Sequence, residues 1–120
     1  MFLGYVSVTT GDRERAMSQF AETLAEFRKL RDRSGEGLAL TALGTGYSFR
    51  HADETAIALH REAREIFRAI GDQQSEAITL NGIAQGYQNL HEYELALKHY
   101  QEALRQFQKN GSVDFATVNL

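Results

Sequence analysis

The sequence predicts an all-α protein made of repeated helical hairpins, and three observations lead to this prediction. The first is that the 120-residue chain matches itself without a gap when it is shifted by 40 residues. The second is that its apolar residues recur at the three- and four-residue spacing of amphipathic helices. The third is the absence of proline. Proline breaks helices, so a chain without it favours long uninterrupted ones.

The repeat is clearest at small, apolar and aromatic positions. These are the positions that helix packing constrains most. The aligned sets include Ala16, Ala56 and Ala96; Phe27, Phe67 and Phe107; Gly46 and Gly86; Tyr47 and Tyr87; and His51 and His91. We therefore expect one domain over residues 1–120 with a core shared between its repeats. Its units cover approximately residues 1–35, 36–75 and 76–115.

The apolar spacing within each complete unit predicts two helices. The first helices are expected at residues 36–50 and 76–90, and the second helices at residues 12–33, 53–70 and 93–110. Gly71 is expected to end a helix because glycine tolerates the left-handed conformation, and Asp53 is expected to cap the start of one. Residues 1–10 are predicted to be the end of a first helix and residues 114–120 the start of another. The repeats are therefore cut out of phase at both ends.

Composition excludes several classes of function. The formal net charge of −3 provides no general attraction to nucleic acid or to an anionic membrane, so neither is expected as a partner. The absence of cysteine rules out disulfides, thiolate metal sites and cysteine nucleophiles, and agrees with a cytoplasmic location. No apolar stretch approaches the length of a membrane-spanning helix. The apolar N-terminus lacks a leading positive region, which favours a helix end over a signal peptide.

The spacing of small and aromatic residues resembles the tetratricopeptide repeat. One unit supplies Leu40, Leu43, Gly44, Tyr47, Ala56, His60 and Ala63, and the next supplies Leu80, Ile83, Ala84, Tyr87, Ala96, Tyr100 and Ala103. His60 replaces the usual aromatic residue. The common unit has about 34 residues and a proline. The longer, proline-free unit is similar to the variety found in kinesin light chains and in bacterial signalling regulators. This resemblance implies a right-handed superhelix of antiparallel helix pairs, with the first helices lining its concave face.

In the tetratricopeptide family, ligands usually meet the exposed face of the first helix. Here that face carries uncharged hydrogen-bonding side chains, namely Thr41, Thr45, Ser48, Asn81, Gln85 and Gln88. Such side chains suit the backbone amides of an extended peptide or a short helix. They do not suit the charged-tail clamp of chaperone-binding members, because no lysine or arginine occurs on the face before Arg50. The alternative is that these residues are simply solvated.

Chemistry is not indicated elsewhere in the chain. The Gly44–Gly46 stretch lies inside a predicted helix and lacks the ending of a phosphate-binding loop. No two histidines have the spacing of a helical metal site, and His51 and His91 are expected in exposed turns. The basic run at residues 28–33 is expected to be a solvated helix end. We therefore expect no catalytic residues, no metal and no cofactor.

The sequence accordingly predicts a non-catalytic scaffold that binds a protein or peptide segment of unidentified sequence. An alternative is a ligand- or partner-sensing regulatory segment of a larger bacterial signalling protein. The cut repeats leave apolar residues at both ends, and stacking of these ends can build a homodimer. The predicted self-association residues are Leu3, Tyr5, Val6, Phe115, Val118 and Leu120.

Overall fold

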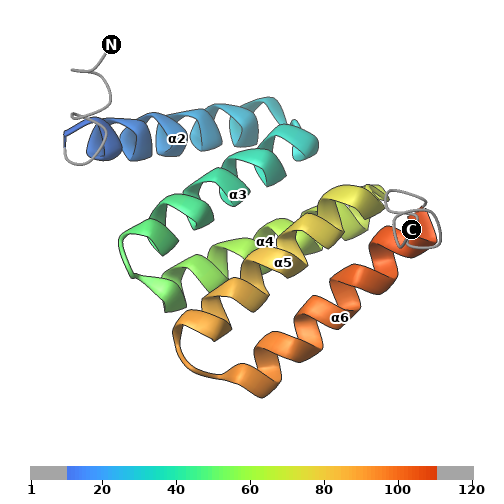
Figure 1. Cartoon of the computed structure of the whole chain (residues 1–120). Coiled ribbons are helices and arrows are strands. Elements are labelled where there is room, and N and C mark those ends of the chain that lie inside the picture. Colours follow the sequence, from blue (N-terminus) through green and yellow to red (C-terminus); the bar gives the residue numbers. More distant parts are fainter. Residues whose placement is uncertain (1–10, 111–120) are drawn as a thin grey trace, which may run out of the picture.

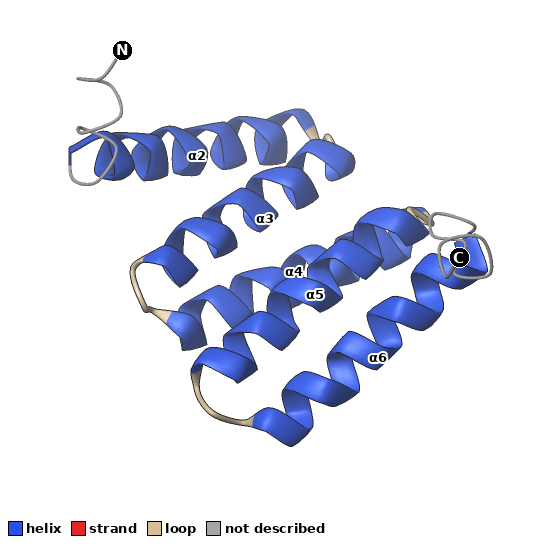
Figure 2. Cartoon of the chain, in the orientation of Figure 1, coloured by secondary structure: helices blue, strands red, loops and turns tan. Residues whose placement is uncertain are grey.

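The computed structural model describes residues 11–110 and is all-α over that range, with five helices and no strand (Figure 2). The helices are α2 (Gly11–Leu30), α3 (Arg33–Phe49), α4 (Asp53–Ile70), α5 (Gln73–Asn89) and α6 (Tyr93–Asn110). The all-α prediction is confirmed for this part of the chain. The segments predicted at residues 1–10 and 114–120 lie outside the described residues, and so do all six predicted self-association residues. The division into three units stays a prediction.

Helix starts differ from the prediction in α3 and α5, which both begin three residues earlier than expected. The reason is capping by aspartate. The Asp32 carboxylate accepts a hydrogen bond from the backbone N–H of Gly35 at 3.0 Å, and Asp72 accepts one from Ser75 at 3.1 Å. Each bond satisfies a backbone donor that the first helical turn would leave unpaired. Since Asp32 starts the next helix, the prediction that α2 extends to residue 33 is wrong.

Two predicted helix ends have different outcomes. Gly71 ends α4 with a φ of 79°, which confirms its predicted role. The prediction that Asp53 caps α4 is wrong, because Ala52 occupies the cap and makes no side-chain bond there. Asp53 is instead the first helical residue, and its carboxylate accepts a hydrogen bond from the side-chain amide of Asn89 at 3.0 Å. This bond joins the start of α4 to the end of α5.

Each described helix packs against the next one in the chain, so the helices form successive antiparallel hairpins (Figure 1). α3 and α5 also contact each other directly, although α4 lies between them in the sequence. The core lies between these helices and includes Leu40, Phe67, Leu80 and Ile83, all of them at most 1% exposed. The recurrent alanines at 56, 63, 96 and 103 are buried as expected. Small side chains there allow the helices to approach closely.

Ion pairs recur 40 residues apart and join α2 to α3 and α4 to α5. Arg28 Nε lies 3.1 Å from a carboxylate oxygen of Glu36, and Arg68 Nε lies 3.2 Å from one of Glu76. Both carboxylates are buried and each has a second arginine partner, Arg33 for Glu36 and Arg64 for Glu76, so the arginines compensate the buried charge. Arg28 belongs to the basic run of the sequence, and its pairing agrees with a structural role for that run. Within residues 11–110, no helix has the length and apolar character needed to span a membrane.

Candidate functional site

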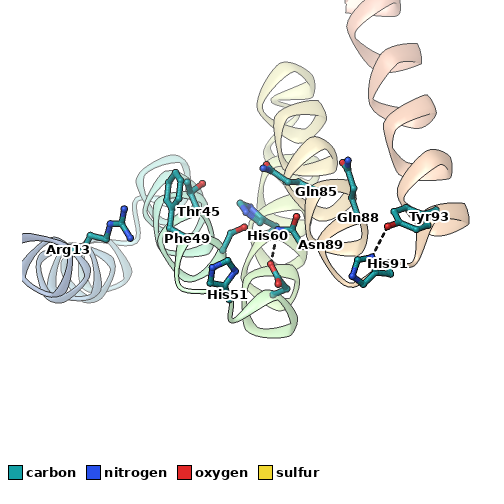
Figure 3. A pocket seen from close by; sticks show the side chains of 13 residues that line it. Arg13, Thr45, Phe49, His51, His60, Gln85, Gln88, Asn89, His91 and Tyr93 are labelled. Carbon is teal, nitrogen blue, oxygen red and sulfur yellow. Dashed lines mark hydrogen bonds between the residues drawn. The ribbon is translucent and has the colours of Figure 1, made fainter. Parts of the chain in front are cut away.

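A cavity of about 680 Å³ lies beside the C-terminal halves of α3 and α5, and we call it the polar cavity (Figure 3). Hydroxyl and amide side chains of both helices line it, and four of them belong to the six predicted binding residues. These four are Thr45 and Ser48 of α3 and Gln85 and Gln88 of α5. The structure therefore brings together two pairs of residues that are 40 positions apart in the sequence.

The other two predicted residues do not line the polar cavity. Thr41 and Asn81 lie one helical turn before Thr45 and Gln85, respectively. The Thr41 hydroxyl donates a hydrogen bond to the backbone carbonyl of Gly37 within α3 at 2.9 Å. Asn81 is exposed on α5. Two of the three predicted residues on each helix thus line the hollow.

The rim of the polar cavity contains residues that the sequence did not single out for binding. Asn89 lies here, bonded to the buried carboxylate of Asp53. His91 contributes Nδ1, which lies 2.6 Å from the Tyr93 hydroxyl oxygen. The turn residues His51 and His91 have positive φ values of 61° and 65°, so both turns use the left-handed conformation. The recurrence of histidine at this position was the sequence signal for the two turns.

Existing hydrogen bonds orient some of the lining groups. Gln88 Oε1 accepts a bond from the Tyr100 hydroxyl at 3.0 Å, which leaves the Gln88 amide nitrogen able to donate to a ligand. The Thr45 hydroxyl donates to the Thr41 carbonyl at 3.1 Å, so its oxygen can still accept. At the edge of the cavity, the Arg13 guanidinium lies 5.5 Å from the centre of the Phe49 ring. The cavity can therefore both donate to and accept from a ligand.

His60 reaches the polar cavity from α4, on which it is only 3% exposed. In Figure 3 its ring lies between the helices that carry Thr45 and Gln85. A methyl group at Gly44 would lie 2.8 Å from His60 Nε2, and one at Gly82 would lie 2.7 Å from the same atom. The ring can therefore occupy this position only because Gly44 and Gly82 have no side chains. Burial lowers the pKa of His60 below its ordinary value of 6.5, because desolvation disfavours the charged form.

A second hollow of about 470 Å³ lies between α2 and α3, and we call it the apolar groove. Its lining includes Phe20, Ala42 and Phe49. Shifted by 40 residues, these correspond to His60, Gly82 and Asn89 of the polar cavity. The two hollows thus have lining residues 40 positions apart in the sequence, and their chemistry differs because these side chains differ.

Within residues 11–110, no group of three or more histidine or carboxylate side chains is arranged to hold a metal ion. No protein-family model matches the chain, and no curated protein matches it. The evidence for function therefore comes from the geometry of the site.

Proposed function

We propose that this chain is a non-catalytic module that binds a segment of another protein on the face formed by α3 and α5. The observation that carries the proposal is the polar cavity on these two helices, lined by Thr45, Ser48, Gln85 and Gln88. As part of this proposal, the helices form a right-handed superhelix of the tetratricopeptide kind in a cytoplasmic protein. The direct contact of α3 with α5 supports an inner face made of first helices.

The chemistry of the polar cavity favours a peptide backbone as the ligand. A backbone amide presents one donor and one acceptor, and the lining hydroxyls and amides complement both. The volume of about 680 Å³ is within the range of about 300–1,000 Å³ that is usual for ligand pockets. The carboxylate of Asp53 is already bonded to Asn89. A neutral stretch of extended peptide is therefore a better match than a strongly charged group.

The experiment is a binding screen of the full chain against arrayed peptides with acetylated N-termini and amidated C-termini, so that end charges do not contribute. Peptides that bind are then measured by calorimetry against Gln85→Ala and Gln88→Ala. Loss of one neutral hydrogen bond weakens affinity by about 2- to 10-fold. Gln74→Ala is the matched control, because Gln74 is exposed on α5 and lines neither hollow. The proposal fails if no peptide binds, or if all three variants weaken binding equally.

The apolar groove supports a second candidate, a regulatory segment that senses a partner or associates with itself. Phe49 is 64% exposed and Phe20 is 37% exposed, so the first described hairpin presents aromatic surface. Light scattering over a concentration series tests self-association. We expect a mass that rises with concentration, and a Phe20→Glu variant that remains monomeric. A wild-type chain that is monomeric at every concentration would exclude self-association.

A further inference from the structure

The His60 ring crosses the gap between α3 and α5 and ends at the polar cavity. Nε2 is the ring atom nearest to the methyl positions of both Gly44 and Gly82, and Gly82 itself lines the cavity. At the other end of the ring, Nδ1 is buried and has no hydrogen-bond partner within the described residues. The side chain therefore brings a polar group to the cavity without using it in the fold.

The two ring nitrogens have unequal surroundings, and this decides the tautomer. A neutral imidazole carries one N–H donor and one acceptor nitrogen. A proton on Nδ1 would be a buried donor without a partner, a state that folded proteins rarely contain. A proton on Nε2 lies on the side of the ring next to Gly82, a lining residue of the cavity, where water or a ligand can accept it. The favoured form thus presents an N–H donor to whatever occupies the polar cavity.

We propose that the cavity binds a neutral carbonyl oxygen, such as that of a backbone amide, through the Nε2–H group of His60. This inference rests on the proposed function and adds a donor from α4 to the α3–α5 face. Gln85 and Ser48 line the same cavity and have oxygen atoms that can accept the amide N–H of the ligand. The residue 40 positions before His60 is Phe20, which lines the apolar groove and has no side-chain N–H. Of the two hollows, only the polar cavity therefore has this donor.

The charged groups around the polar cavity argue for a neutral ligand. Arg13 is at the edge, against the Phe49 ring, and the Asp53 carboxylate on α4 accepts from Asn89 of α5. The turn residues His51 and His91 complete the titratable groups of the lining, apart from Tyr93. An anion at His60 would meet one peripheral arginine and a nearby carboxylate. A carbonyl oxygen needs only the single donor.

Nuclear magnetic resonance of the ¹⁵N-labelled full chain tests this directly. Long-range proton–nitrogen correlation spectra distinguish the two tautomers, and we expect the proton on Nε2. N-methylacetamide, acetate and methylammonium are then added in separate titrations. We expect N-methylacetamide to shift the His60 ring signals most. His60→Gln, which keeps an N–H donor, should retain binding of N-methylacetamide, whereas His60→Phe should weaken it by about 2- to 10-fold. Circular dichroism checks that both variants fold.

Three results would overturn the inference: a proton on Nδ1, a larger ring shift with acetate than with N-methylacetamide, or equal binding of N-methylacetamide by His60→Phe and the wild type. These results are separable from failure of the proposed function. If capped peptides bind in a Gln85-dependent manner and His60→Phe binds them equally well, the function stands and the role of His60 does not. If no capped peptide binds at all, the proposed function fails first.

Discussion

Replacing Gly82 by alanine would place a methyl group 2.7 Å from Nε2 of His60, which is too close for an unperturbed contact. The ring also lies close to Gly44 on the other helix, where an added methyl group would lie 2.8 Å from the same atom, so it is confined between two glycine positions. Overpacking of this kind costs about 1–3 kcal/mol. Replacing glycine by alanine within a helix otherwise stabilises the helix by about 1 kcal/mol. We expect Gly82→Ala to lower the free energy of unfolding by a net amount of up to about 2 kcal/mol.

Whether Gly82→Ala lowers or raises the free energy of unfolding depends on the His60 ring, so a double-mutant cycle isolates the contribution of their contact. In a His60→Ala background the obstacle is gone, and Gly82→Ala should raise the free energy of unfolding by about 1 kcal/mol. Urea denaturation followed by circular dichroism measures all four proteins. If Gly82→Ala has the same effect in both backgrounds within about 0.5 kcal/mol, the packing of His60 against Gly82 is refuted.

Two further predictions concern buried ionisable groups. Because burial lowers the pKa of His60, the unfolded chain binds the proton first, so the free energy of unfolding should fall as pH decreases from 6.5 toward the folded-state pKa. Denaturation curves at a series of pH values should show this slope in the wild type and a shallower one in His60→Phe. Glu76→Gln should cost about 1–3 kcal/mol in thermal or urea unfolding, because its buried carboxylate pairs with Arg68 and Arg64. Glu65→Gln is the control: it removes an exposed carboxylate 3.9 Å from Arg68 and should change the free energy of unfolding by less than about 0.5 kcal/mol. If both variants lose the same stability, burial of the Glu76 ion pair does not explain the loss.

Helix positions were largely predictable because they depend on local chemistry. The apolar spacing and Gly71 led to the bounds of α4, and the same spacing led to those of α6. The starts of α3 and α5 were missed although a signal was present. Asp32 and Asp72 recur at the 40-residue period, and each caps the helix that follows it. A recurrent aspartate immediately before an apolar run would have placed both starts.

The candidate site was predictable only in part. Thr45 and Gln85 were recognised because helical periodicity places them on one face and the repeat places that face on two helices. His60 was identified as a departure from the repeat pattern but not as a cavity residue. Its spacing assigns it to the packed face of α4, and periodicity does not indicate that Gly44 and Gly82 leave room for its ring between the two neighbouring helices. That depends on side chains from three helices.

The sequence by itself determined the all-α class, the approximate helix bounds and the neutral character of the α3–α5 face. These follow from interactions over a few residues and from a repeat that can be read directly along the chain. Only the tertiary structure decided that the Asn89 amide meets the Asp53 carboxylate and that the His60 ring reaches the polar cavity. Both depend on how closely non-adjacent helices approach. That distance is set by the combined packing of many side chains rather than by any local pattern.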